Sequence, residues 1–202
     1  MADLTYVAAA VEGDVDEVVL RRILEQFRAE PYAVYGKRGK HYLGEKLNAY
    51  NQAAGFGPWF VIRDLDHDAN CAPQLCAELL PHPARLMCFR IAVREIESWL
   101  MADAERLSEY VGVPIGRVPA NPETLDHPKR ELVDLARRSR FRTVREDMVP
   151  RPESGRAVGP AYSSRMIEYA SRVWRPRVAE RNAPSLRRCR QRVGELVVKA
   201  TR

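Results

Sequence analysis

The chain has 202 residues, of which 46% are apolar and 30% charged, a composition that excludes an intrinsically disordered or membrane-embedded protein. Its four cysteines, Cys71, Cys76, Cys88 and Cys189, are too few for a disulfide-stabilised secreted scaffold. The first residues show no basic start followed by a long apolar run, so we expect no secretory signal and a cytoplasmic location.

The net charge of +6 is unevenly distributed along the chain. Residues 1–136 carry 15 basic and 21 acidic side chains, whereas residues 137–202 carry 18 basic and 6 acidic ones. A polyanion such as nucleic acid would be attracted to the basic part. Arginine outnumbers lysine 28 to 5, however, and genome base composition can produce such a bias without any ligand. Both explanations of the basic part stay open.

Strand-like and helix-like segments alternate through the first half of the chain. Residues 5–11 form an apolar run of strand length, and residues 16–28 repeat apolar side chains at the three- and four-residue spacing of a helix face. In chain order, the pattern predicts a strand at 5–11, a helix at 16–28, a short strand at 32–35, a helix at 42–54, a strand at 59–62, a helix at 73–80, a strand at 85–93 and a helix at about 94–103. This alternation predicts an α/β fold with a mostly parallel sheet between helices.

The second half is predicted to form helices separated by proline-rich loops at 111–128 and 147–161. Helices are expected at about 128–139, with Asp126 as N-cap, at 163–174 and at 185–199. The tryptophans Trp59, Trp99 and Trp174 are expected in the core. We therefore predict an α/β domain at 1–110 and a helical, Arg-rich extension at 111–202 that packs on it.

Acidic side chains follow two of the expected strands. Glu12 follows the first strand, Asp64 and Asp66 follow the third, and Asp68 comes two residues later. In sheets of this kind ligands bind beyond the carboxyl ends of the strands, and the two-residue period of a strand lets Asp64 and Asp66 point the same way. Each carboxylate alone could also be a solvated loop residue or, as for Asp16, a helix cap. As an ordered set, these residues predict a functional site.

Glu95 and Glu97 follow the next strand, but in a helix their spacing corresponds to a turn of about 200°, so only one can face the site. Clustered carboxylates repel one another unless a cation neutralises them. Hard oxygen ligands favour Mg²⁺ or Mn²⁺, which can clamp a phosphodiester and activate water. The carboxylates would act as metal ligands, and Glu12 is also a candidate for proton transfer.

The motif Val11-Glu12-Gly13-x-x-Asp16, followed later by Asp64-Leu65-Asp66, resembles the TOPRIM domain of topoisomerases, primases and OLD-type nucleases. The string at residues 92–103 (AVREIESWLMAD), with Gly159-Pro160-x-Tyr162 and residues 184–186, resembles an uncharacterised bacterial family of small TOPRIM-like proteins. The resemblance implies that Glu12, Asp64 and Asp66 hold Mg²⁺ and that Asp16 matches a second acidic position of the nuclease branch. It also implies a place beside ATPases in mobile or anti-phage defence loci.

The chain departs from the nuclease pattern in one respect. No lysine stands at the place of the late partner that some of these nucleases use, which weighs against cleavage but not against metal binding.

The leading hypothesis is a Mg²⁺-dependent nuclease, or another phosphodiester-processing enzyme acting on DNA or RNA. Its expected catalytic residues are Glu12, Asp64 and Asp66, and its metal ligands are these three with Asp16, Asp68, Glu95 and Glu97. The nucleic acid would bind Arg137, Arg138, Arg187, Arg188 and Arg190. Two alternatives stay open: a non-catalytic adaptor or nucleic-acid-binding subunit that docks on a partner ATPase, and a small-molecule binder with a structural carboxylate cluster.

Overall fold

The computed structural model describes residues 4–201 and contains two compact units. The first unit holds residues 4–93 and 185–201, and the second holds residues 94–184. These units do not coincide with the expected domains, 1–110 and 111–202. Residues 1–3, on which the expectation of no secretory signal partly depends, and residue 202 lie outside the described part.

The first unit is built on a four-stranded sheet in which every neighbouring pair of strands is parallel. The spatial order of the strands is β2-β1-β3-β4. In chain order the elements are β1 (Thr5–Val11), α1 (Asp14–Glu25), β2 (Ala29–Gly36), α2 (Gly39–Ala53), β3 (Trp59–Asp64), α3 (Ala72–Leu79), β4 (Met87–Ala92) and, from the end of the chain, α10 (Pro184–Ala200). The predicted α/β class with a parallel sheet between helices is confirmed.

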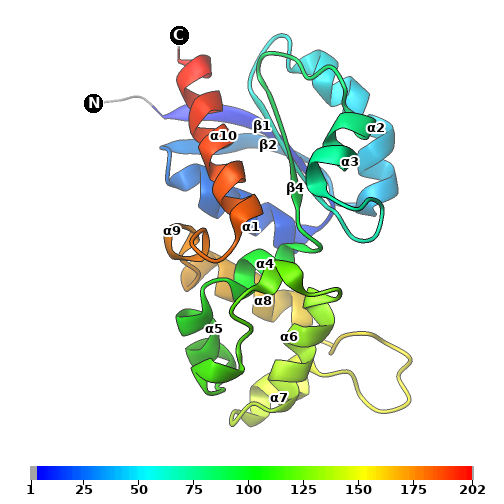
Figure 1. Cartoon of the computed structure of the whole chain (residues 1–202), viewed down its shortest axis with the longest axis vertical. Helices are drawn as coiled ribbons and strands as arrows, with labels where there is room; N and C mark the ends of the chain where they lie inside the picture. Colours follow the sequence, from blue (N-terminus) through cyan, green and yellow to red (C-terminus); the bar gives the residue numbers. More distant parts are fainter. Residues whose placement is uncertain (1–3, 202) are drawn as a thin grey trace. The chain divides into compact units, whose positions relative to one another are not determined.

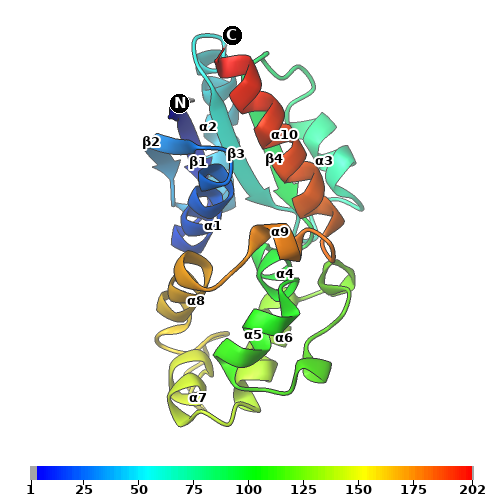
Figure 2. The same cartoon turned by 90° about the vertical axis from the view of Figure 1, so that its left-hand side faces the viewer.

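Helices cover both faces of this sheet (Figures 1 and 2). Helices α2 and α3 cover one face, where Leu43 and Leu47 pack against alternate residues of β1 and β3 such as Ala10 and Val61. Helices α1 and α10 lie on the other face (Figure 2). Both faces of the central strands are therefore buried, which explains the continuous apolar runs in their sequences.

Helix α10 contacts the end of α1 closely. A Cβ atom added at Gly194 would stand 3.0 Å from the ring of Phe27, and the guanidinium of Arg190 lies 5.6 Å from the centre of the same ring. The basic C-terminal helix is thus an integral part of the first unit.

Strand β2 is longer than the predicted segment 32–35. It pairs with β1 from Ala29 to Gly36. The strand has no continuous buried apolar run, because Tyr32 and Tyr35 are exposed. Gly36 ends the strand at φ 90°, in the left-handed region. Pairing with β1, which local sequence patterns do not encode, determines the extent of this strand.

The second unit is helical, with α4 (Ile96–Met101), α5 (Ala104–Val111), α6 (Pro128–Arg137), α7 (Arg142–Met148), α8 (Tyr162–Arg172), α9 (Pro176–Ala179) and two 3-10 turns at Ile115–Arg117 and Pro122–Thr124. Trp99 and Trp174 are fully buried, and the Trp174 indole N–H donates to the Trp99 carbonyl at 3.1 Å. The buried carboxylate of Asp103 accepts two hydrogen bonds from the Arg175 guanidinium, at 2.9 and 2.6 Å. Within residues 4–201, the helices are all too short or too polar to cross a bilayer.

The three tryptophans are buried as expected, since Trp59 is only 8% exposed and stacks on Tyr50 with 4.9 Å between ring centres. The prediction that Asp126 is the N-cap of α6 is wrong. The helix begins after His127, which makes no side-chain cap bond, and the carboxylate of Glu95 accepts the N–H of Lys129 instead, at 2.6 Å. A side chain distant in the sequence has replaced the local cap because tertiary contacts bring it there.

Replacing Gly36 by alanine should lower the free energy of unfolding by about 2 kcal/mol or more, because the new Cβ would overlap the Val11 carbonyl. Gly39→Ala is the matched control, since Gly39 also has positive φ but no atom lies within 4 Å of its Cβ position. It should cost only about 1 kcal/mol. Urea denaturation measures both, and equal losses would contradict the placement of β2 against β1.

Candidate functional site

The candidate site lies at the carboxyl ends of β1 and β3, which are neighbours in the sheet. The chain leaves β1 toward β2 on one side and later returns to β3 on the other. Parallel sheets bind ligands at such a topological switch point, where helices diverge to opposite faces. The predicted carboxylates Glu12 and Asp64 stand at the ends of these two strands.

Glu12 is the first residue after β1, and its carboxylate is bonded to β3. Its Oε1 accepts the backbone N–H of Asp64 at 3.0 Å, so the side chain continues the β1–β3 hydrogen-bond ladder beyond the end of β1. Burial, together with the charge of Asp66, raises the pKa of Glu12, even though the Asp64 N–H and the Arg63 guanidinium favour the charged form. Glu12 is thus directed toward the aspartate segment, as the sequence predicted.

The aspartates are not arranged as a strand would arrange them. Strand β3 ends at Asp64, and Asp66 lies in the following turn with φ 47°. The two-residue period of a strand therefore does not apply to this pair. The expectation that it makes Asp64 and Asp66 point the same way is wrong, because the turn comes between them.

The sheet separates the predicted carboxylates into two groups. Successive strand residues point to opposite faces, and Arg63 shares its face with Val61, which packs in the core beneath α2. Asp64 consequently points to the face covered by α1, the helix that carries the buried Asp16. Glu12, which contacts Arg63, belongs with the other group.

Two cations lie among the carboxylates of the α2 face. The Lys40 Nζ is 2.9 Å from Oδ2 of Asp66 and 2.9 Å from Oδ1 of Asp68. Arg63, which is 8% exposed, places Nη2 2.5 Å from Asp68 and Nε 3.8 Å from Glu12. We call these five residues the switch-point cluster.

Ion pairs within the switch-point cluster shift the pKa values of Lys40 and Asp68. Hydrogen bonds to Asp66 and Asp68 raise the pKa of Lys40. Partial burial acts to raise the pKa of Asp68, but the Lys40 hydrogen bond and the charges of Lys40 and Arg63 outweigh it and lower that pKa. Lys40 and Asp68 are therefore charged at neutral pH, and the opposite charges of the cluster largely balance one another.

The fit of a divalent ion can be tested on this arrangement. The donors are hard oxygens, which suit Mg²⁺, but Lys40 and Arg63 stand between them. Within residues 4–201, His, Cys, Asp and Glu side chains nowhere gather in a group of three that could hold a metal ion. As these residues are placed, they do not fit the metal site that the family resemblance implies.

Lys40 is the residue that sequence reasoning missed. It follows β2, and the Lys37 and Gly39 N–H groups donate to the Val11 and Glu12 carbonyls at 2.9 and 3.1 Å. These bonds hold the loop after β2 against the end of β1. The basic, glycine-rich stretch at 36–41 was the available signal, but only the pairing of β2 with β1 brings it to the carboxylates.

Glu95 and Glu97 belong to the second unit and have their partners there. Glu95 caps α6, as described above. Glu97 is 1% exposed; its Oε1 accepts the Tyr162 hydroxyl at 3.1 Å and lies 3.4 Å from the Lys129 Nζ. Burial, followed by the charge of Glu95, raises the pKa of Glu97 above its ordinary value, although Lys129 opposes this.

The five predicted nucleic-acid-binding arginines fall on both units. Arg137 and Arg138 are exposed at the end of α6, and Arg187 and Arg188 are exposed on α10. Arg190 is only 9% exposed and donates from Nε to the Gln26 Oε1 at 3.0 Å. In this structure it joins α10 to α1 and does not face solvent.

Comparison of the chain with protein-family models, with curated proteins and with solved structures gave no match. The resemblance to TOPRIM proteins therefore rests on the sequence motifs alone.

Tyr162→Phe should lower the free energy of unfolding by about 1–3 kcal/mol, because the buried carboxyl group of Glu97 loses a hydrogen bond. Because the pKa of Glu97 is raised, stability falls as the pH rises through that pKa. Loss of the Tyr162 hydroxyl raises the pKa of Glu97 further. The destabilisation should therefore shrink as pH is lowered toward 4.5, the ordinary value.

Tyr169→Phe is the matched control in this pH series. The buried Tyr169 hydroxyl donates to the backbone carbonyls of Leu100 and Asp103, which do not titrate. Urea unfolding at several pH values should show a constant loss for this variant, and an equally constant loss for Tyr162→Phe would contradict the role of Glu97.

Proposed function

We propose that this chain is a protein-binding adaptor and that its switch-point cluster is structural. The observation that supports this most directly is that Lys40 pairs with Asp66 and Arg63 lies beside Glu12, so that two of the three carboxylates expected to hold the divalent ion already have cations next to them. These two cations supply the positive charge that the resemblance assigns to Mg²⁺.

Arg63 is the more deeply buried of the two cations. Its side chain is 9% exposed, whereas the side chains of Lys40 and Asp66 are 28% and 31% exposed. A partly exposed ion pair such as Lys40–Asp66 contributes roughly 0–1 kcal/mol, and a metal ion can displace it. The side chain of Asp68, the close partner of Arg63, is 30% exposed, but the Arg63 guanidinium is itself buried, and leaving a buried charge without its partners costs up to about 3–5 kcal/mol. Metal binding beside Glu12 would therefore require an expensive rearrangement of Arg63.

An adaptor acts through its surfaces. The exposed arginines of α10 and the sheet edge formed by β4 belong to the first unit. The ATPase that the family resemblance implies is the first partner to test by co-purification.

Lys40→Met tests the neutralisation directly. Without the ammonium, Asp66 and Asp68 lose their shared partner, so we expect the variant to be less stable in metal-free buffer and to gain affinity for Mn²⁺. Added Mn²⁺ at about millimolar concentration should raise the melting temperature of the variant by several degrees and leave the parent protein unchanged. Thermal unfolding and calorimetric titration with Mn²⁺ measure both effects.

Lys37→Met is the control, because Lys37 pairs instead with Asp14 and Glu17, outside the switch-point cluster. It should gain no metal affinity. Tight binding of Mn²⁺ by the parent protein, with Lys40→Met unaltered, would overturn the structural role of the cluster.

A second candidate function is the metal-dependent nuclease, and the location of the cluster at the switch point between β1 and β3 favours it. It requires Lys40 and Arg63 to give up their carboxylate partners when substrate and metal bind. In that case the two cations would be available for the phosphate group.

A cleavage assay separates the two functions. The parent protein, incubated with Mg²⁺ or Mn²⁺ and either DNA or RNA, should leave the nucleic acid intact if it is an adaptor. Cleavage that the Asp64→Asn, Asp66→Asn double variant loses by about 100-fold or more would establish the nuclease instead.

Arg190→Gln should not change nucleic-acid affinity selectively, because this side chain is buried against Phe27.

A further inference from the structure

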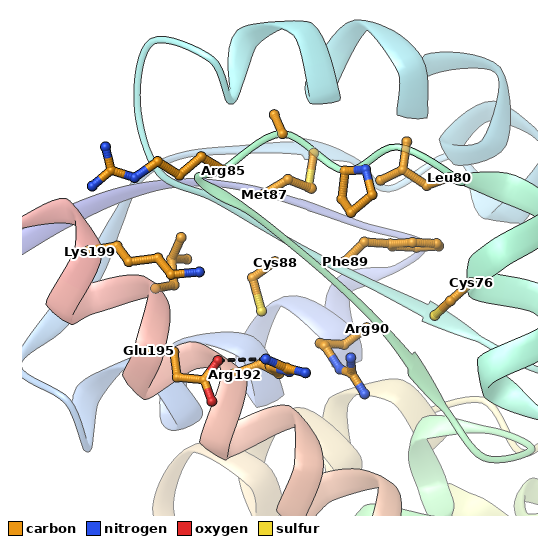
Figure 3. A pocket seen from close by; sticks show the side chains of 13 residues that line it. Cys76, Leu80, Arg85, Met87, Cys88, Phe89, Arg90, Arg192, Glu195 and Lys199 are labelled. Atoms are coloured by element: carbon orange, nitrogen blue, oxygen red, sulfur yellow. Dashed lines mark hydrogen bonds and ion pairs between the residues drawn. The ribbon is translucent and has the colours of Figure 1, made fainter.

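A groove of about 420 Å³ runs beside β4 in the first unit (Figure 3). One wall comes from the α3 side and includes Cys76 and Leu80, and the other comes from α10 and includes Arg192 and Lys199. Residues 87–90 of β4 lie between them. Side chains from both faces of β4 line the groove, so it follows the edge of the sheet and not one of its faces (Figure 3).

Strand β4 is an edge strand, and of its outward backbone groups the Met87 N–H already donates to the Ala84 carbonyl at 3.0 Å. Among residues 4–201, its only strand neighbour is β3. The Trp59 N–H donates to the Leu86 carbonyl and the Leu65 N–H to the Ala92 carbonyl, each at 2.9 Å. Because strand residues alternate in the direction of their backbone groups, the even-numbered residues of β4 face β3 and Phe89 directs its N–H and C=O away from the sheet. These groups can accept a further strand.

The groove is strongly cationic. Its lining contains Arg85, Arg90, Arg192 and Lys199 but only one carboxylate, Glu195. Glu195 is already bonded to Arg192 at 2.7 Å. In addition, the Arg90 Nε is buried and makes no hydrogen bond within the described part of the chain. A ligand of this groove should therefore bring negative charge.

We propose that the groove binds an extended acidic segment of a partner protein, which adds to β4 as a fifth strand. This inference rests on the proposed adaptor function and names the partner's docking segment. Side chains of an added strand would alternate between two walls. Those on the α10 side meet Arg90, Arg192 and Lys199, and those on the α3 side meet the apolar Leu80 and Phe89. The segment should thus alternate acidic and apolar residues.

A peptide fits these features better than a nucleic acid does. A phosphate backbone would be attracted to the cationic wall, but it would leave the outward backbone groups of β4 unpaired and its charge would lie near the apolar wall. An acidic strand satisfies the backbone ladder, the cations and the apolar wall together.

The test uses a fluorescein-labelled peptide of about eight residues that alternates glutamate with valine or leucine. The full chain should bind it in a fluorescence-anisotropy titration, and added salt should weaken the binding. A peptide of the same composition with its glutamates in one block should bind more weakly, because it cannot match the two walls.

The second arm of the test concerns the backbone. Methylating the N–H groups on the edge of the peptide that faces β4 removes its ladder donors and keeps every side chain. Loss of binding is expected. Equal binding of the methylated peptide would overturn strand addition and indicate simple charge attraction.

The third arm concerns the cationic wall. The Arg90→Gln, Lys199→Gln double variant should bind the peptide about tenfold more weakly. Arg187→Gln with Arg188→Gln is the matched control, since both residues are exposed on α10 and neither lines the groove. Circular dichroism checks that both variants are folded.

Two further results would overturn the proposal: no binding of the alternating peptide by the folded parent protein, or a single-stranded oligonucleotide that competes for the groove and depends equally on Arg90 and Lys199. Neither result changes the Mn²⁺ titration of Lys40→Met, so this proposal and the proposed function fail separately.

Discussion

Compensation of buried carboxylates is the constraint on which both units depend. A carboxylate removed from water must be neutralised or given hydrogen bonds, because otherwise it protonates or destabilises the fold. In the first unit the buried Arg63 lies beside the largely buried Glu12 and also pairs with the more exposed Asp68. In the second, Arg175 provides this compensation to the buried Asp103. The chain therefore supplies from its own basic residues much of the charge that its acidic segments require.

This constraint gives the arginine-rich composition a structural meaning. Arginine is suited to buried pairs because its planar guanidinium can donate several hydrogen bonds at once and keeps its charge. Arg190 shows the same use on α10, where it bonds Gln26 and lies over Phe27. Part of the positive charge that would suggest a polyanion ligand is thus engaged within the fold. The exposed arginines of α6 and α10 are a separate set.

The order of the strands creates two distinct places where this chain can meet a ligand. The chain adds β2 on one side of β1 and β3 on the other, which puts the switch point between β1 and β3. The same strand order leaves β4 at an edge. The switch point gathers acids and the cations that pair with them, whereas the groove at β4 gathers cations in excess. The two places therefore attract ligands of different charge.

Much of the first unit was predictable because its strands and helices carry strong local patterns. The runs at 5–11, 59–62 and 85–93 all contain strands, since central parallel strands are buried on both faces. The helices α5, α7 and α9 were not predicted. They are short, and tertiary contacts rather than a long apolar period stabilise them. Strand β2 was underestimated for a similar reason, because its partner decides its length.

For the site, the sequence by itself determined which acidic residues stand at the strand ends, since strand ends follow from the apolar pattern. It also determined the α/β class. Only the tertiary structure decided which charges meet. Lys40 reaches Asp66 across 26 residues of sequence because β2 lies beside β1, and the alternation of β3 sends Arg63 and Asp64 to opposite faces. Electrostatic partners are chosen by distance in space, which strand order and register establish and which no local pattern encodes.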